Sequence, residues 1–324
     1  MKNTLDIVLL LALPASGKSE VRRYLAHQTP ETCKNDFHMG PTVQLDDFPY
    51  VHIMRRADDE CAKLGKGRMF FASGDKPFIN PLDWGTLLEL VNEDYADLLG
   101  KKAYSSDSCA EQLIARIDRA SKKVGAPERF AQLDADTRKK LCAILEPETK
   151  ELLKEKLASY TDLNGKTLVI EFARGGAQGS PLPLKAPFGY QYSLGILSRE
   201  ILEKAVILFI WVTPEESRRK NSARANPDDP GSILHHGVPM EVMLNDYGVD
   251  DMDWLEQHSE KPGTVTVKAH GKTWHLPIAR FDNRVDKTSF LRAEQKDWAP
   301  ASVKAVRDGI KGAMDKLFAF VSGK

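Results

Sequence analysis

The sequence predicts an α/β protein with three layers, α/β/α, a mostly parallel sheet and an inserted all-helical subdomain. Apolar runs of strand length occupy residues 7–13, 166–173 and 205–212, and a helix-like segment lies downstream of each. A continuous apolar run predicts a strand buried on both faces, as in a parallel sheet. From 83 to 160, apolar residues instead recur every three or four positions, which predicts helices alone.

The first apolar run leads into a loop of small residues, 12–19, which ends in Gly-Lys-Ser before a helix predicted over 20–27. This matches the phosphate-loop pattern Gly-x-x-x-x-Gly-Lys-[Ser/Thr], except that Ala12 replaces the first glycine. Ala12 fits the pattern if it ends the strand with ordinary extended backbone. Lys18 would reach the β- and γ-phosphates, and Ser19 would ligate Mg²⁺. The residues expected to hold the nucleotide are Pro14, Ala15, Ser16, Gly17, Lys18 and Ser19.

Two acidic residues follow the second predicted strand. Residues 28–40 are polar and predict a connection, 41–45 predict a short strand, and Asp46-Asp47-Phe48 comes directly after it. Ligands bind beyond the carboxyl ends of parallel strands, so both carboxylates would face the same crevice as the phosphate loop. Asp46 or Asp47 would act as general base for an acceptor hydroxyl. An Asp that caps the next helix is the alternative.

A phosphate loop followed by Asp46-Asp47-Phe48 resembles the uridine kinase, phosphoribulokinase and nicotinamide riboside kinase group of P-loop kinases. The resemblance implies that an Asp in this motif activates the acceptor hydroxyl, with Asp46 as the first candidate and Asp47 as the second. Residues 80–88 are similar to a segment that borders the acceptor site in this group, although Asp83 there equally predicts a helix N-cap. The likeness spans roughly residues 4–90 and 165–295.

The predicted strand over 166–173 carries an acid near its end, as a Walker B element does. Glu171 would lie near Mg²⁺ and contact it through water. The kinase group commonly ends this strand in Glu-Gly, which Glu171 matches and Phe172 does not. A strand-end acid exposed to water is the alternative. A helix is predicted to follow over 190–204.

A helix with several arginines follows the apolar run 205–212. Thr213 as cap and Pro214 at the first helical position predict where it starts. Its Arg218, Arg219 and Arg224 resemble the lid arginines of nucleoside and nucleotide kinases, which stabilise charge on the transferring phosphoryl group. A solvated helix face is the alternative.

The last part of the chain predicts a helix over 240–253, strands over 264–267 and 273–278, and a C-terminal helix over 302–321 that packs on the sheet. After the last strand, Asn283 stands where many P-loop kinases have a loop beside the nucleotide base. Residues 283–286 approach the Asn-Lys-x-Asp element by which GTPases recognise guanine, but the Lys is replaced. ATP is therefore the expected donor, and GTP stays open.

The composition argues against several classes of protein. The chain has 324 residues, 42% of them hydrophobic and 28% charged, and its formal net charge is zero. Zero net charge argues against a general binder of nucleic acid or anionic membranes. No run of about 18 apolar residues occurs, so no transmembrane helix is expected. The four cysteines are widely spaced without Cys-x-x-Cys, which favours reduced thiols in a cytoplasm.

Together these features predict an ATP- and Mg²⁺-dependent kinase that transfers the γ-phosphoryl group to a hydroxyl of a nucleoside-, sugar- or vitamin-like acceptor. The expected P-loop kinase core comprises 1–82 and 161–324, and the helical insertion 83–160 would serve acceptor binding or oligomerisation. A homodimer stays open. A zeta-toxin-like kinase of nucleotide sugars is the alternative enzyme. A nucleotide-dependent switch or assembly protein is the alternative without a transfer reaction.

Overall fold

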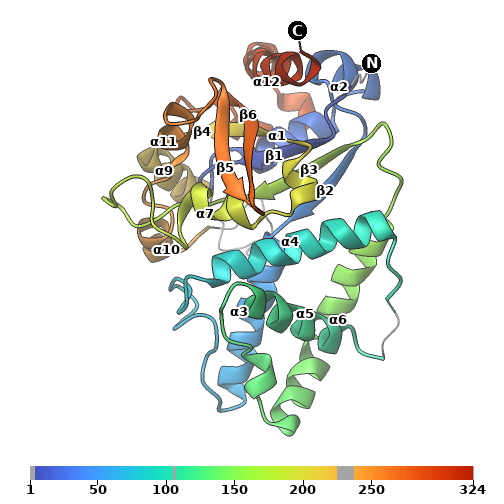
Figure 1. Ribbon diagram of the computed structural model, residues 1–324, viewed down its shortest axis with the longest axis vertical. Helices are drawn as coiled ribbons and strands as arrows, with labels where there is room; N and C mark the ends of the chain where they lie inside the picture. Colours follow the sequence, from blue (N-terminus) through green and yellow to red (C-terminus); the bar gives the residue numbers. More distant parts are fainter. Residues whose placement is uncertain (1–3, 105–106, 225–236, 324) are drawn as a thin grey trace.

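The computed structural model describes residues 4–104, 107–224 and 237–323. Its centre is a six-stranded sheet with the strand order β2-β3-β1-β4-β6-β5 (Figure 1). Neighbouring strands run parallel except for the last pair, β6 and β5. This confirms the predicted α/β class with a mostly parallel sheet. The strands are β1 (Ile7–Leu11), β2 (Thr42–Asp46), β3 (Thr167–Phe172), β4 (Ala205–Trp211), β5 (Thr264–Ala269) and β6 (Lys272–Asp282).

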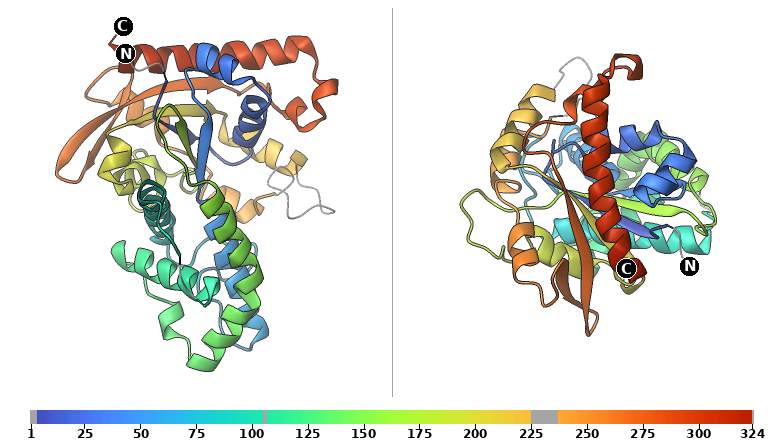
Figure 2. Two further views of the ribbon diagram at one scale, coloured as in Figure 1. Left: turned by 90° about the vertical axis from the view of Figure 1, so that its right-hand side faces the viewer. Right: turned by 90° about the horizontal axis from the view of Figure 1, so that it is seen from above.

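Helices flank the sheet on both faces, because β1 and β4 are apolar at every position and β3 is buried along its whole length. In β1, Ile7, Leu9 and Leu11 pack into one core, and Val8 and Leu10 pack into another on the opposite face. Figure 2 shows the long C-terminal helix crossing the sheet, which confirms the helix predicted over 302–321. One face is covered by α1 (Lys18–Ala26), α2 (Pro30–Phe37) and α12 (Pro300–Ser322), and the other by α4 (Asp83–Gly100), α7 (Gly189–Ile196), α8 (Arg199–Leu202) and α11 (Met252–Gln257).

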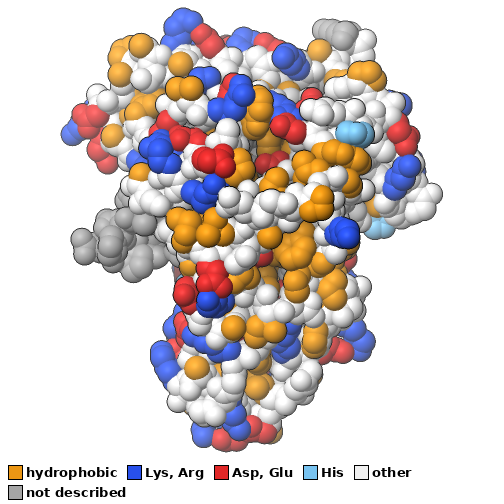
Figure 3. All heavy atoms as spheres, turned by 90° about the vertical axis from the view of Figure 1, so that its left-hand side faces the viewer, with side chains coloured by type: hydrophobic (Ala, Val, Ile, Leu, Met, Phe, Trp, Pro, Cys, Tyr) orange, Lys and Arg blue, Asp and Glu red, His pale blue; other side chains and the backbone are white. Residues whose placement is uncertain are grey.

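A block of helices lies below the sheet in Figure 1. Helix α4 joins the two parts, since Leu88 and Val91 pack on the sheet while Leu87 and Leu90 pack into the block. On the face drawn in Figure 3, hydrophobic side chains gather around the middle of the molecule. Besides α4, the block contains α3 (Phe48–Lys63), α5 (Cys109–Lys123), a 3₁₀ helix (Phe130–Gln132) and α6 (Ala135–Ala158), so the structure adds α3 to the helices predicted within 83–160.

The connection predicted over 28–40 is wrong, because this stretch contains helix α2. Thr29 caps the helix: its hydroxyl oxygen accepts a hydrogen bond from the Thr32 N–H at 3.1 Å. Pro30 then occupies the first helical position. Phe37 is the one fully buried residue of α2, so the helix has almost no apolar face to announce it.

Three other local predictions are also corrected. The helix predicted over 240–253 is interrupted after α10 (Met240–Asn245), and the helix predicted over 190–204 is divided into α7 and α8. Asp83 does not cap α4; its carboxylate accepts two hydrogen bonds from buried Arg129, at 2.8 and 3.0 Å.

None of the helices in the described ranges is both long and apolar enough to cross a membrane. The remaining elements are α9 (Pro214–Arg224) and two 3₁₀ helices (Ser289–Arg292 and Gln295–Asp297).

Candidate functional site

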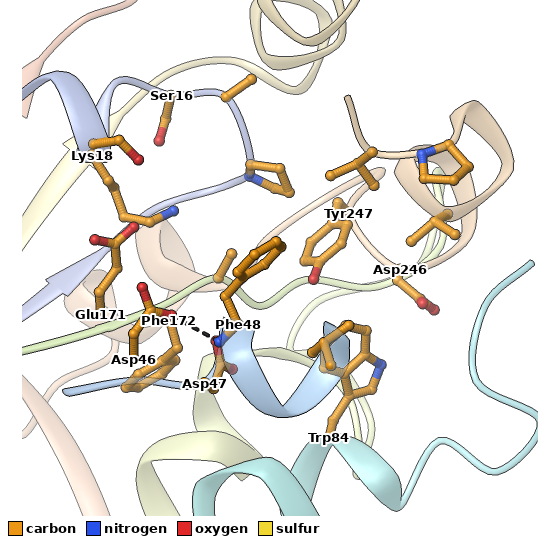
Figure 4. A pocket seen from close by; sticks show the side chains of 18 of the residues that line it. Ser16, Lys18, Asp46, Asp47, Phe48, Trp84, Glu171, Phe172, Asp246 and Tyr247 are labelled. Atoms are coloured by element: carbon orange, nitrogen blue, oxygen red, sulfur yellow. Dashed lines mark hydrogen bonds between the residues drawn. The ribbon is translucent and has the colours of Figure 1, made fainter. Parts of the chain in front are cut away.

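A cavity of about 160 Å³ opens beyond the carboxyl ends of β1, β2 and β3. Strands β2 and β3 lie on one side of β1, and β4, β5 and β6 lie on the other. Open α/β sheets bind ligands in the crevice where the strand order switches sides in this manner. In Figure 4, Lys18 and Glu171 lie on one side of the cavity, and Trp84, Tyr247 and Asp246 lie on the other. We call residues 14–19 with Asp46 and Glu171 the loop end, and Phe71, Phe78, Trp84, Asp246 and Tyr247 the aromatic end.

The loop end is built on the turn from β1 into α1. Gly17 has a φ of +107°, and a Cβ atom there would lie 2.5 Å from a neighbouring hydroxyl oxygen, so only glycine fits. Two distant residues hold the backbone of this loop. Asn283 Nδ2 donates to the Ser16 carbonyl at 2.7 Å, and Ser217 Oγ donates to the Pro14 carbonyl at 2.6 Å. Contacts within the protein therefore fix the shape of the loop.

Ala12 is compatible with this geometry. It is not among the residues with positive φ, so alanine in place of the first glycine of the pattern introduces no backbone strain. Lys18 is 8% exposed, and its Nζ lies 3.4 Å from the carbonyl oxygens of Ala12 and Leu13. These contacts are long for hydrogen bonds, so they hold the ammonium over the loop only weakly. Lys18 and Ser19 both line the cavity.

Asp46 and Glu171 lie side by side, as partners in the pairing of β2 with β3. Arg22 of α1 contacts both: its Nη1 is 2.8 Å from Glu171 Oε2 and 3.4 Å from Asp46 Oδ2. Asp46 Oδ1 accepts a 2.8 Å hydrogen bond from the Phe48 N–H at the start of α3. Burial, followed by the negative charges of Glu171 and Asp47, raises the pKa of Asp46 to about 7. Asp46 thus supports a helix start and also titrates where a general base operates.

Asp47 lies between the two ends of the cavity (Figure 4). Its carboxylate is 2.7 Å from Nη1 of Arg174, a side chain that is only 2% exposed. The same guanidinium donates to the Ala173 carbonyl at 2.6 Å and to the Trp84 carbonyl at 3.2 Å. Burial raises the pKa of Asp47, and the charge of Arg174 opposes that rise. Arg174 therefore fixes Asp47 relative to the first turn of α4.

Aromatic rings dominate the other end of the cavity. Phe71 and Phe78 are stacked with ring centres 4.4 Å apart. Trp84 meets Phe78 edge-on at 4.9 Å and Tyr247 at 5.6 Å. Asp246 lines the cavity beside them and is 5% exposed, and burial raises its pKa to about 7. The aromatic end is therefore a mostly apolar recess with one carboxyl, and Arg55, stacked on Phe71, also lines the cavity.

Arg218 and Arg219 of α9 do not line the cavity, although α9 itself contacts the loop. Arg218 pairs with Glu215 at 3.1 Å, and Arg219 pairs with Glu216 at 2.6 Å. Arg224 is the last residue of α9, and its side chain lies outside the described part of the chain. The structure thus brings Lys18 and the three acids together but leaves Arg218 and Arg219 outside the lining.

Asn283 does not line the cavity either. It is fully buried, and its side-chain amide is engaged with the protein. Besides holding the Ser16 carbonyl, Nδ2 donates to Thr288 Oγ1 at 2.9 Å, and Oδ1 accepts from the Lys287 N–H at 2.7 Å. These contacts make Asn283 a support for the loop 14–19 rather than a group open to a base.

The site contains residues that the sequence did not single out. Arg22 stands one helical turn after Lys18, so the spacing alone places it on the same face of α1. Asp246 and Tyr247 carry no comparable signal, because they follow a short helix in a polar stretch. Their place in the cavity depends on tertiary contacts.

Among the described residues, no group of three or more His, Cys, Asp or Glu side chains is arranged to hold a metal ion. A metal here would need further ligands from a bound molecule or from water. A scan against protein-family models found no match, and a search of curated proteins found none. The geometry of the cavity is therefore the basis for assigning a function.

Proposed function

We propose that this protein is a P-loop kinase of the three-layer α/β/α class that transfers the γ-phosphoryl group of ATP to a hydroxyl of a small molecule. One observation carries this proposal: a phosphate-type loop, a carboxyl with a pKa of about 7 and an apolar recess share one cavity. A donor site, a base and an acceptor site within reach of each other are what phosphoryl transfer requires, because catalysis rests on positioning and charge stabilisation.

The loop end suits the phosphates of a nucleotide. Helix α1 begins at Lys18, so the positive end of its dipole and the lysine charge meet at the cavity. The buried Ser16 hydroxyl has no hydrogen-bond partner among the described residues, which leaves it free to donate to an anion. Ser19 and Glu171 would hold Mg²⁺, with phosphate oxygens and water as its other ligands. When bound, Mg²⁺ supplies positive charge that neutralises the β- and γ-phosphates.

Asp46 and Asp47 are the two candidates for the base that accepts the proton of the attacking hydroxyl. The pKa of Asp46 favours this role at neutral pH. Asp47 lies nearer the aromatic end in Figure 4, and Arg174 holds its carboxylate in place. Both residues stay in the proposal.

The transition-state role predicted for Arg218, Arg219 and Arg224 stays a prediction. The first two lie outside the cavity lining, and each is paired with an acid on its own helix. Truncation of each arginine to Ala, with kcat measured for the acceptor reaction, tests the role directly.

An acceptor screen tests the proposed function. The protein is incubated with ATP, Mg²⁺ and a panel of nucleosides, sugars and hydroxymethyl-bearing vitamins, and ADP release and phosphorylated product are measured. At least one acceptor should stimulate ATP consumption. Lys18→Ala should lower that turnover by about 10²–10³-fold, the usual cost of removing one transition-state donor. Lys304→Ala, at an exposed position of α12, is the matched control and should keep full activity.

The same screen separates the kinase from its alternatives. Stimulation confined to nucleotide sugars would indicate a zeta-toxin-like activity. Slow ATP hydrolysis that no acceptor stimulates would contradict the kinase proposal and favour a nucleotide-dependent switch.

A further inference from the structure

Asp246 is a buried carboxyl to which phosphoryl transfer gives no task. It lines the aromatic end and is 5% exposed, and its Oδ2 has no hydrogen-bond partner within the ranges that the structure describes. A buried hydrogen-bond acceptor left unpaired destabilises the folded protein. A ligand that donates a hydrogen bond to Asp246 would remove this cost. Figure 4 shows Asp246 on the opposite side of the cavity from Lys18.

The fold keeps this carboxyl inside the cavity. The loop that follows Asp246 is hydrogen-bonded to the segment after β3: the Gly176 N–H donates to the Val249 carbonyl at 2.8 Å, and the Val249 N–H donates back at 3.2 Å. The two segments approach so closely that a Cβ atom on Gly248 would lie 2.4 Å from the Gln178 nitrogen. Such close packing of backbone on backbone opposes any rotation that would expose Asp246 to water.

Aromatic side chains form the walls near Asp246. The Trp84 and Tyr247 rings are inclined at 69° to one another, and the stacked pair Phe71 and Phe78 continues the wall from Trp84. Rings of this kind bind a planar apolar ligand by stacking and by burial of its surface. The whole cavity, loop end included, measures about 160 Å³, close to the roughly 150 Å³ of a cavity that binds benzene, so the aromatic end offers space for no more than one ring. One ring with a short substituent therefore fits.

Two arginines near Asp246 indicate the charge of the ligand. Arg55 and Arg174 both act electrostatically on Asp246, against the rise of its pKa that burial causes. The Arg55 guanidinium stacks 3.9 Å from the centre of the Phe71 ring. Neither arginine forms an ion pair with Asp246 among the described contacts. These cations disfavour a permanently positive ligand, whereas a neutral N–H donor satisfies Asp246 without repulsion.

We propose that Asp246 selects the acceptor, which is a neutral, single-ring aromatic alcohol whose ring carries an N–H or NH₂ donor. The donor binds Asp246, the ring lies against Trp84 and Tyr247, and the hydroxyl reaches toward Asp46 and Asp47. This inference rests on the proposed kinase function and narrows its substrate class. Open-chain polyols and sugars without such a ring are poor acceptors, because they offer neither stacking surface nor an N–H group.

Matched ring alcohols test the proposal without nucleotide. The probes are 3- and 4-aminobenzyl alcohol, benzyl alcohol, cyclohexylmethanol and glycerol, and their Kd values for the wild type and for Asp246→Ala are measured by ligand-observed NMR. The amino group isolates the contact with Asp246, and the cyclohexyl ring isolates the aromatic stacking. At pH 8, where Asp246 with its pKa of about 7 is mostly ionised, wild type should bind the better aminobenzyl alcohol at least about tenfold more tightly than benzyl alcohol, since a hydrogen bond to a charged group is worth that much. Asp246→Ala should lose this preference and keep its affinity for benzyl alcohol.

Two further variants control for misfolding and for effects of a substitution outside the cavity. Asp246→Asn keeps the shape of the side chain and should show a reduced preference even if Asp246→Ala folds poorly. Asp253→Asn, a half-exposed acid outside the cavity, should behave as the wild type. Equal affinity of the wild type for the amino and unsubstituted rings, or a preference that survives in Asp246→Ala, would overturn the proposal.

Binding of a fluorescent ATP analogue to the same proteins separates this proposal from the kinase function. Asp246→Ala should bind the analogue as the wild type does, because the loop end is intact. Discrimination between the rings without acceptor-stimulated ATP consumption supports recognition by Asp246 and counts against the kinase. Acceptor-stimulated consumption without discrimination supports the kinase and counts against this role of Asp246.

Discussion

At the loop end of the cavity the lining is backbone and charge, whereas at the aromatic end it is a set of rings around one carboxyl. The loop end takes most of its residues from one short run, 14–19, with an acid from each of two neighbouring strands. The aromatic end takes its residues from two distant stretches of the chain: Phe71, Phe78 and Trp84 from 71–84, and Asp246 and Tyr247 from the segment after α10.

On the proposed kinase function, the difference follows from what each end would bind. A phosphate chain looks alike in every nucleotide, so a single turn with a glycine, a lysine and a helix start serves it. An organic acceptor has an individual shape, and its recess must be assembled by tertiary packing. The two ends should therefore respond separately to substitution, and the following experiments test that separation, from the largest effect to the smallest.

Substitution of Asp46 or of Asp47 should have the largest effect on catalysis. Asp46→Asn or Asp47→Asn should lower acceptor-dependent kcat by about 10²–10⁴-fold, the usual contribution of a general base, and the variant with the larger loss identifies the base. Nucleotide affinity measured without Mg²⁺ should stay unchanged in both variants, because Lys18 and residues 14–19 are intact. If kcat falls in neither variant, then neither Asp46 nor Asp47 acts as the base.

Arg174→Met should destabilise the whole fold, because it leaves the carboxylate of Asp47 buried without its partner. The expected loss in the free energy of unfolding is about 3–5 kcal/mol, measured by urea denaturation. The double variant Arg174→Met with Asp47→Asn should recover part of this loss. A single variant as stable as the wild type would show that Arg174 does not join the two ends.

The pH dependence of catalysis should reflect the ionisation of Asp46 at the loop end. Asp46 has a pKa of about 7 and must be deprotonated to accept a proton. The acceptor-dependent kcat/KM should therefore rise by up to about tenfold per pH unit below pH 7 and level off above it. A profile that stays flat between pH 5 and 8 would exclude Asp46 as the base, and a profile shared by Asp46→Asn would assign the titration to another group.

The pH dependence of stability should report the aromatic end, with the opposite sign. Asp246 has a pKa of about 7 in the folded protein and roughly 3.9 when unfolded, so the folded state binds the proton more tightly. Its contribution to stability is complete below about pH 4 and is lost as the pH rises through about 7, by at most about 1.4 kcal/mol per unit. Urea denaturation from pH 5 to 8 should show a shallower decline for Asp246→Asn than for the wild type. Identical slopes would contradict the assignment.

Arg22→Gln should have the smallest effect. Arg22 forms ion pairs with Glu171 and Asp46, which are the acids nearest the expected cation. Partly exposed ion pairs contribute up to about 1 kcal/mol, so removal of the competing charge should tighten Mn²⁺ binding by up to about fivefold. Mn²⁺ titration in the presence of a non-hydrolysable ATP analogue measures this. Weaker binding would mean that Arg22 orders the acids for the metal instead of competing with it.

The strands were predictable from the sequence because burial on both faces leaves a continuous apolar run, as in β1, β3 and β4. Helix α2 escaped prediction because Phe37 is its one fully buried residue, so no apolar periodicity marks it. The positions of Lys18, Asp46 and Glu171 at one edge of the sheet were also predictable. Parallel strands bring their carboxyl ends together, whatever the details of packing.

Most of the aromatic end was beyond the reach of sequence patterns, although Trp84 lies within residues 80–88, the segment that the resemblance placed beside the acceptor site. A carboxyl such as Asp246 that follows a helix is exposed in most settings, and here it is buried because the segment after β3 packs against its loop. Tyr247 and Trp84 meet for the same reason, although nothing local links them. Long-range packing decides both, and apolar periodicity reports only short-range order.

Strand β2 lies at the edge of the sheet and is paired on one side only, with β3. The strand that carries Asp46 therefore has half the interstrand hydrogen bonding of β1, and Gln44 beside it is exposed and contacts Arg22. Amide hydrogens in edge strands exchange with solvent through small local openings, whereas those in central strands wait for larger ones. The exchange rates of the β2 amides should therefore report whether a ligand is bound at the loop end. A ligand that bridges Asp46 and Glu171 should slow exchange in β2 and leave the exchange rates in β1 unchanged.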